Sequence, residues 1–388
     1  MNRSLSTLLR LCAAAASLVL LCGCSADRSI YRNFRAIEEL QTVHTLGIDH
    51  SGAGVSVTAA VDDRDSDNAP PVVRRSGSSI LRAMDQLQDY TRQGRLFFAH
   101  VRYILLGQAQ AEAGLGELLD YMERDVDTRM GTFLFVLRDS TAEELLSILS
   151  GGEISQLLAS IQRDTALQGS SHVYDVRSTA VALSEYGATP VCALRLVPTE
   201  HSVLSDAPEY TAVPDGYGIL KSGTLVAFLS GSEAEAASLL AGQLGTVNRN
   251  YPLGADGHVT LELQCDRPEL TPCFGADGSL SRLEVSARVS AALAEADLPQ
   301  TQVLSEPMLQ QLSAAVAAEL TENIRQALAL SKTLNADYLS LAAALQRPGM
   351  PPLPEHWLQT VDFLVQVDTV IDHSYDMSEP LGAEGGHR

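Results

Sequence analysis

The cysteine at position 24 is the residue whose surroundings point most clearly to a chemical reaction. It closes the tetrapeptide Leu21-Cys22-Gly23-Cys24, which resembles a bacterial lipobox, the signal for diacylation of the final cysteine thiol. Two arginines and a twelve-residue apolar run, 11–22, precede it. Because this run is shorter than the roughly 20 residues of a spanning helix, it is typical of a signal peptide. The pattern predicts a cleaved lipoprotein signal peptide, 1–23, and lipidation of Cys24.

An ordinary secretory signal peptide cleaved near Ala26 is the alternative, but the cysteine directly after Gly23 favours the lipoprotein. Two or three acyl chains hold a protein at a membrane, since each buried methylene contributes about 0.8 kcal/mol. After Cys24 no segment approaches 18 consecutive apolar residues. We therefore expect the remaining chain to fold in water, outside the membrane.

Other reactive patterns are incomplete. Asp63-x-Asp65-x-Asp67 imitates the start of a calcium loop, but Asn68 stands where the turn needs glycine and Arg74 where it needs a bidentate glutamate. A solvated acidic loop is the favoured interpretation. The chain has no nucleophile elbow, phosphate-binding lysine loop, dinucleotide fingerprint or zinc-protease motif, and only two lysines. The residues therefore predict no enzyme activity, no metal and no cofactor.

Four single residues carry weaker signals. His100 follows an apolar segment, where a hydrogen-bonded structural histidine is favoured over a catalytic one. Trp357 is the single tryptophan, and a core or domain-interface position is favoured over stacking on a ligand. Cys265 and Cys273 lie eight residues apart around two prolines, which allows a local disulfide. Two free thiols are the favoured alternative.

Composition bounds the class of protein. The chain has 388 residues, of which 27 are Lys or Arg and 48 are Asp or Glu, so its formal net charge is −21. Cleavage before Cys24 removes two arginines and no acidic residue, which leaves a charge of −23. Such a charge repels phosphate backbones and anionic lipid headgroups, which argues against nucleic-acid binding. The length predicts two or three compact domains.

The hydrophobic pattern predicts alternating strands and helices in the first half of the chain. These are strands at 45–49 and 55–61, a polar loop at 62–71, a helix at 79–91 capped by Ser78 or Ser79, a strand at 97–106, a helix at 115–124, a strand at 132–138 and a helix opened by Ser140 or Thr141. The second half begins with a hairpin of 217–220 with 224–229 and a helix from 232 to about 244 capped at Ser232-Glu233. Strands at 258–264 and 282–293, a long helix at 306–346 and a strand at 363–371 follow.

Several short motifs occur in a recognisable order. They are Leu46-Gly47-Ile48-Asp49, 96–102 with 104–107, 117–121 with Arg124-Asp125, Gly216-Tyr217-Gly218-Ile219-Leu220-Lys221, Asn335-Ala336-Asp337-Tyr338 and Trp357. With Cys24 in front, this series resembles the C subunit of spore nutrient-germinant receptors, the GerAC-type lipoproteins. Ser25 replaces the aromatic residue common after the lipidated cysteine, and glycines common after the Ala-Asp pair are missing.

The resemblance implies an α+β fold of three domains, each a mixed β-sheet flanked by helices. The expected organisation is an N-terminal α+β region at 24–200, a small hairpin-helix region at 210–250, a C-terminal α+β domain at 251–375 and a disordered tail at 376–388. The resemblance also implies a non-catalytic subunit needed to trigger spore germination. It would lie on the outer face of the inner spore membrane with two integral membrane subunits, A-type and B-type.

Two other classes stay open at this point. A lipid-anchored solute-binding protein of a transporter would share the lipobox and the size, although sugar sites favour stacked aromatics and only 5% of the residues are aromatic. A cell-wall hydrolase would need paired carboxylates in a cleft, which the sequence does not locate among 48 acidic residues.

Overall fold

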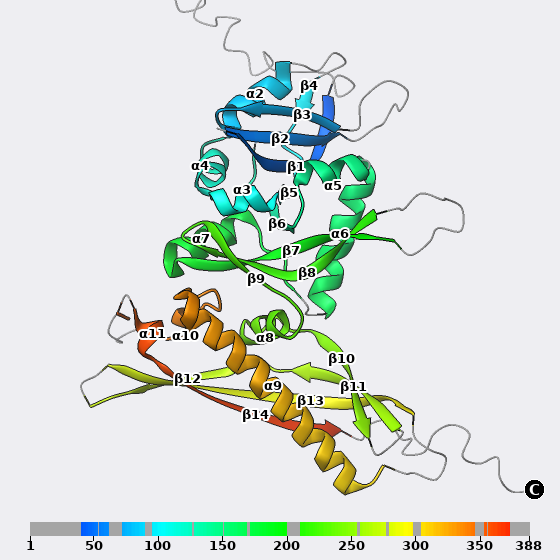
Figure 1. Cartoon of the computed structure of the whole chain (residues 1–388), viewed down its shortest axis with the longest axis vertical. Helices are drawn as coiled ribbons and strands as arrows, with labels where there is room; N and C mark the ends of the chain where they lie inside the picture. The colour runs from blue at the N-terminus through cyan, green and yellow to red at the C-terminus, as the bar shows by residue number, and fades with distance from the viewer. Residues whose placement is uncertain are drawn as a thin grey trace, which may run out of the picture.

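The described residues of the computed structural model form two β-sheets joined by helix α8 (Ser232–Leu240). The molecule is elongated, with the first sheet above the second and α8 between them (Figure 1). The structure describes residues 40–52, 54–61, 72–89, 95–125, 128–149, 151–168, 171–199, 210–253, 257–276, 279–297, 304–345, 353–354 and 356–372.

The first sheet has nine strands in the order β3-β2-β1-β5-β6-β7-β8-β9, with β4 paired to β1. Their bounds are β1 (Leu40–Ser51), β2 (Gly54–Val61), β3 (Val72–Gly77), β4 (Arg95–Phe97), β5 (Tyr103–Leu106), β6 (Phe133–Arg138), β7 (Ala188–Pro198), β8 (Tyr210–Lys221) and β9 (Thr224–Leu229). The central strands β1, β5, β6 and β7 run parallel, and antiparallel strands flank them. All four residues of β5 are buried, as expected of a parallel strand covered on both faces.

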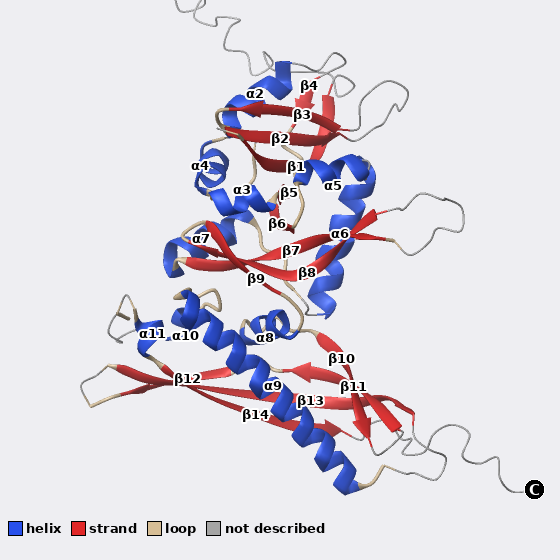
Figure 2. Ribbon diagram, viewed as in Figure 1, coloured by secondary structure: helices blue, strands red, loops and turns tan. Residues whose placement is uncertain are grey.

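Helices lie on both sides of this sheet (Figure 2). They are α2 (Ile80–Asp89), α3 (Gln108–Ala113), α4 (Gly116–Arg124), α5 (Ala142–Ile148), α6 (Gly151–Gln168) and α7 (Val176–Tyr186). Alternate residues of β5 enter different cores: Ile104 packs with residues of α2, α4 and α7, and Leu105 packs with residues of α5 and α6. The period-2 alternation of a strand thus divides the helices between the two faces.

The second sheet has five strands in the order β10-β11-β13-β12, with β14 paired in parallel to the other side of β13. The strands are β10 (Thr246–Leu253), β11 (Gly257–Cys265), β12 (Glu269–Phe274), β13 (Leu280–Asp297) and β14 (Asp362–Asp372), and the remaining helices are α9 (Glu306–Leu334), α10 (Leu341–Leu345) and α11 (Trp357–Thr360). The first half of α9 packs on this sheet through Leu312 and Val316. Its second half, with Ile324 and Leu328, joins the core around α8. This confirms that α9 is wrapped on more than one side.

Most predicted elements are confirmed, but the predicted strand at 97–106 is wrong. Residues 95–97 form β4 and residues 103–106 form β5, and both pair with β1. Between these two pairings the chain has five residues, 98–102, where β1 has only two, 43–44. The additional residues form a turn. The Val101 N–H donates to the Phe98 carbonyl at 3.0 Å and closes it. His100 therefore lies in an exposed turn, not in a strand.

Two helix boundaries also differ from prediction. The long helix was expected to reach residue 346, but α9 ends at Leu334 because Asn335 is left-handed, with φ 47° and ψ 51°. The helix expected at 232–244 is α8, which ends at Leu240, and its N-cap is Gly231 without any side-chain cap bond. The predicted caps of the first half hold: Ser79 Oγ accepts from the Arg82 N–H, and Thr141 Oγ1 accepts from the Glu144 N–H.

The α+β class, with mixed sheets flanked by helices, is confirmed. The described residues form two sheets, because the hairpin of β8 and β9, expected in a middle region, extends the first sheet instead. The division into three domains stays a prediction. Within the described ranges, no helix is long and apolar enough to cross a membrane. Residues 1–23, the loop at 62–71 and the tail at 376–388 lie outside the described residues.

Candidate functional site

The predicted lipidation site, Cys24, lies outside the described residues, so its position stays a prediction. Several of the other sequence motifs are brought together in three places of the described structure. These are the Asp49 site in the first sheet, the Asp337 site after α9, and the joint around Tyr217 between the two sheets.

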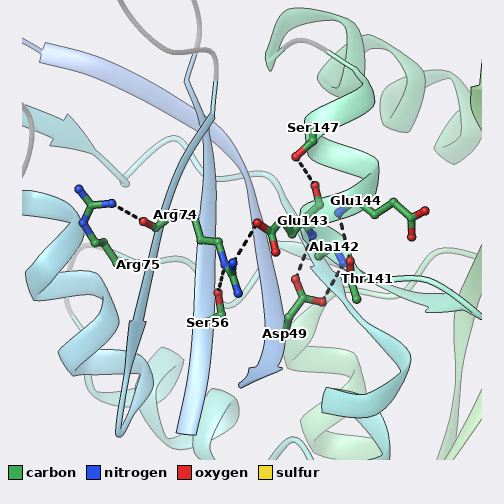
Figure 3. Close-up of polar contacts among 9 residues, drawn as sticks. All are labelled: Asp49, Ser56, Arg74, Arg75, Thr141, Ala142, Glu143, Glu144 and Ser147. Carbon is green, nitrogen blue, oxygen red and sulfur yellow. Dashed lines mark hydrogen bonds and ion pairs between the residues drawn. The ribbon is translucent and has the colours of Figure 1, made fainter. Parts of the chain in front are cut away.

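The Asp49 site caps α5 with a buried carboxylate. Asp49 lies near the end of β1 and is 5% exposed. Its Oδ1 accepts from the Ala142 N–H at 2.8 Å and its Oδ2 accepts from the Glu143 N–H at 2.9 Å, as Figure 3 shows. These are the first two amides of α5, which lack partners within the helix. Both carboxylate oxygens are therefore used to hold α5 on the sheet.

Two glycines of the sequence motifs make room for this contact. A Cβ on Gly107 would lie 2.1 Å from Asp49 Oδ1, and a Cβ on Gly47 would lie 2.7 Å from the Ala142 Cβ. Any side chain at either position would therefore push the carboxylate or α5 away. The glycines of the motifs 46–49 and 104–107 are explained by this close approach.

Charged groups surround the Asp49 site. Arg74 Nε donates to Ser56 Oγ at 2.7 Å, and Arg74 Nη1 lies 3.0 Å from Glu143 Oε1 (Figure 3). Burial raises the pKa of the Asp49 carboxyl, and the negative charge of Glu143 adds to this rise. The two amide donors and the Arg74 guanidinium lower the pKa and oppose it. Arg74 stands where the calcium-loop pattern requires a glutamate, and in the structure it forms an ion pair with Glu143.

The Asp337 site repeats the same device after α9. Asp337 is 6% exposed, and its Oδ1 and Oδ2 accept from the Leu341 and Ala342 N–H groups, each at 2.8 Å. Burial raises its pKa, while the two amides lower it. The neighbouring Tyr338 hydroxyl donates to the Ala327 carbonyl of α9 at 2.8 Å. The motif 335–338 therefore folds the chain back on α9 and starts α10.

The joint between the sheets contains the motif 216–221. Gly216 has a φ of 74°, and a Cβ there would lie 2.1 Å from the Leu229 carbonyl oxygen. The Tyr217 hydroxyl shares a hydrogen bond of 2.7 Å with Ser238 Oγ of α8. Lys221 Nζ donates to the Leu334 carbonyl at the end of α9, at 2.8 Å. The end of the first sheet is thus fastened to both α8 and α9.

Sequence reasoning did not identify the partners in this joint. Tyr174 donates from its hydroxyl to Gln243 Oε1 at 2.7 Å, and burial raises the pKa of Tyr174 to about 12. Lys332, the other lysine of the chain, donates to the Val361 carbonyl at 2.9 Å. The scarcity of lysine was the signal that could have pointed to this joint. Each of the two lysines donates to a backbone carbonyl in a half-buried contact.

The single residues considered in the sequence are placed as follows. Trp357 is 8% exposed and packs in the core around α8, which confirms a core position. His100 has ring contacts with His44 and Phe97, at centroid distances of 6.3 and 5.2 Å. It is exposed and lies in a turn, so its expected place in a strand is wrong, while the choice of a structural over a catalytic histidine stays a prediction.

No disulfide joins Cys265 and Cys273, and both are free thiols. Cys265 faces Val289 of β13, and Cys273 faces Arg282 of the same strand. Seven residues separate these positions, which is about 23 Å along a strand. The free-thiol interpretation is therefore confirmed. Within the described ranges, no group of three or more His, Cys, Asp or Glu side chains is arranged to hold a metal ion, and the Asp63 pattern lies outside them.

Comparison with known families assigns both halves of the chain. Residues 33–194 match the family described as spore germination protein N-terminal domain, and residues 215–375 match the family described as spore germination B3/GerAC like, C-terminal. The chain belongs to the GerAC-type family of germinant receptor C subunits. The two matches divide between residues 194 and 215, where β7 is followed by β8.

The crystal structure of the GerBC protein is similar in fold to this GerAC-type chain. The TM-score is 0.53 at 17% identity, and the match covers 87% of this chain and 99% of the other. No curated protein matches. The family assignment confirms the resemblance on which Asp49, Tyr217 and Asp337 were first singled out, and it gives the chain a role in spore germination. The GerAC-type family is membrane-associated.

Proposed function

We propose that this chain is a lipid-anchored, non-catalytic subunit of a nutrient germinant receptor. It acts with two polytopic membrane subunits, A-type and B-type, on the outer face of the inner spore membrane, and spores need it to respond to a nutrient. The observation that carries the proposal is the pair of adjacent family matches, 33–194 and 215–375, which include nearly all described residues of both sheets.

The structure of the motif residues supports a non-catalytic role. A general acid or base must have its carboxyl within reach of a reacting group. In the described residues, both oxygens of Asp49 and both oxygens of Asp337 already accept from helix amides. The buried tyrosines Tyr217 and Tyr338 are also hydrogen-bonded inside the protein. The recognisable residues are thus used to hold helices in place.

The lipid anchor is proposed at Cys24, on the sequence of the lipobox. Replacing Cys24 with Ala is expected to abolish incorporation of radiolabelled palmitate and to release the chain from the membrane fraction. The matched control is Cys192→Ala, since Cys192 is fully buried in the first sheet and cannot be acylated in the folded protein. Labelling of the Cys24→Ala chain equal to that of the control would refute the anchor.

The receptor role is tested by deleting the gene in the source organism. Deletion spores are expected to lose the fall in optical density that follows addition of at least one nutrient, and the intact gene supplied elsewhere is expected to restore it. Affinity purification of the restored chain from spore membranes is expected to recover two multi-spanning proteins. Deletion spores that respond normally to every nutrient would contradict the proposal.

A further inference from the structure

Strand β14 is an edge strand of the second sheet, and α9 contacts its main chain at Thr369. It pairs with β13 from Asp362 to Asp372 in one uninterrupted parallel register. Strands β11 and β12 occupy the opposite side of β13, so no described strand pairs with the outer side of β14. In Figure 1 this strand forms the lower margin of the second sheet. An unpaired edge of this kind is a template for another strand.

The other edge strands of the described residues are better protected than β14. Strand β3 is six residues long and carries Arg74 and Arg75. Strand β9 has six residues and an irregular register with β8. Strand β10 contains Arg249 and Pro252, and β12 contains Pro272 and a register shift. Short length, bulges, proline, charged residues and a covering helix are the usual protections of an edge. The 11-residue β14 has no proline and no register shift, and its protection is limited to Asp362, Asp368 and the contact of α9 at Thr369.

The solvent face of β14 exposes apolar side chains. Val370 is 68% exposed and Leu364 is 37% exposed, and both point to the face opposite α9. On the same edge, Ser313 Oγ of α9 already donates to the Thr369 carbonyl at 2.6 Å. The Thr369 carbonyl is therefore already used by α9, so an added strand would have to pair with the part of the edge that precedes it.

The charges of β14 indicate which kind of segment can pair with this edge. Asp362 and Asp368 lie on the same exposed face, and the strand has no basic residue. Their inner neighbours in register are Arg282 and Arg288 of β13. A strand added on the outer side would continue this cross-strand alternation best with basic side chains. A second copy of β14 would instead bring acidic residues to an acidic strand, which is unfavourable.

We propose that the edge of β14 docks an extended segment of another protein, which adds a strand to the second sheet. The segment places basic side chains beside Asp362 and Asp368 and apolar side chains beside Leu364 and Val370, while main-chain hydrogen bonds run along the part of the edge that precedes Thr369. This docking edge goes beyond the receptor assignment and does not depend on it.

The test uses nine-residue peptides and the full chain reconstituted in nanodiscs. The probes alternate threonine with outward positions Lys, Val, Thr, Lys and Val, in forward and reverse order, and the controls carry Glu in place of Lys. The lysine peptide of one orientation is expected to bind about tenfold more tightly than its glutamate control. It is also expected to slow amide hydrogen exchange within 362–372.

Variants locate the binding. Val370→Lys is expected to weaken binding of the lysine peptide about tenfold, and the matched control Val181→Lys, at a 47% exposed valine of α7, is expected to bind normally. Asp368→Asn is a second variant, which removes the negative charge at this position with little change in the shape of the side chain. Equal binding of lysine and glutamate peptides, no binding of either, equal effects at positions 370 and 181, or slowed exchange outside β14 would overturn the proposal. Concentration-dependent self-association that protects β14 would assign the edge to a second copy.

Discussion

The two buried aspartates perform the same task in two different surroundings. Asp49 in the first sheet and Asp337 after α9 each direct both carboxylate oxygens at two consecutive helix amides. Asp49 lies beside the Arg74–Glu143 ion pair, whereas the pKa of Asp337 is raised by burial and lowered by its two amides. Helix α5 also keeps a second cap at Thr141.

The same capping arrangement therefore has neighbouring contacts that support it at Asp49 and, among the described residues, lacks them at Asp337. At the Asp49 site, loss of the carboxylate leaves Thr141 and the ion pair to hold α5 near β1. At the Asp337 site, α10 has five residues and no other side-chain cap among the described contacts. We therefore expect the isolated site to be the more sensitive one.

Asp337→Ala is expected to have the largest effect on stability. It leaves two buried amides, those of Leu341 and Ala342, without acceptors, and each costs about 1–3 kcal/mol. We expect the free energy of unfolding, measured by urea denaturation, to fall by about 2–6 kcal/mol. Glu322→Ala, at an exposed position of α9, is the control and is expected to change it by less than about 0.5 kcal/mol.

Asp49→Ala is expected to cost less, about 1–3 kcal/mol. The Ala142 amide is buried and loses its acceptor, but the Glu143 amide is only partly buried, and the Thr141 cap remains. The same denaturation experiment measures the change. A loss larger than that of Asp337→Ala would show that the surrounding charges do not support the Asp49 site.

The pH dependence of Asp337 is expected to oppose that of ordinary carboxylates. Because its folded-state pKa is raised above the usual 3.8, the folded chain binds more protons than the unfolded chain between those two values. The stability that this group contributes is therefore highest below pH 3.8 and falls as pH rises through the raised pKa. Asp337→Asn removes the titration, so the stability of the natural chain relative to this variant should decline as pH rises from 3.8. A relative stability that increases with pH would contradict the raised pKa.

The smallest effect is expected from the exposed ion pair. Arg74→Gln should change the free energy of unfolding by about 0–1 kcal/mol, because Arg74 and Glu143 are 43% and 39% exposed. Its informative readout is the pKa of Asp49, followed by nuclear magnetic resonance. Removing Arg74 should raise that pKa further, and Glu143→Gln should lower it. No shift in either variant would mean that the ion pair does not act on Asp49.

The sequence predicted elements with strong periodicity and missed those set by long-range pairing. Helix α5 and its Thr141 cap followed from local residues. The turn at His100 did not, because it arises from two separate pairings with β1. Helix α6 was missed although Ile154, Leu158 and Ile161 have helical spacing and are buried.

The candidate sites show the same limit. The motifs around Asp49 and Asp337 were recognised in the sequence, but their partners could not be, since Ala142 lies 93 residues from Asp49. The end of α9 was also hidden, because Asn335 stops the helix by adopting a left-handed conformation while the apolar pattern continues to Leu341 and Leu345. Backbone conformation and distant contacts decide these features.

We infer that the motif carboxylates of Asp49 and Asp337 hold the fold and perform no chemistry. This inference is tested by measuring germination rate and the amount of receptor chain in the same spores carrying Asp337→Asn or Asp49→Asn. We expect germination to fall only in proportion to the amount of folded chain, with the greater loss for Asp337→Asn. Spores that hold the normal amount of the variant chain and yet fail to germinate would contradict it.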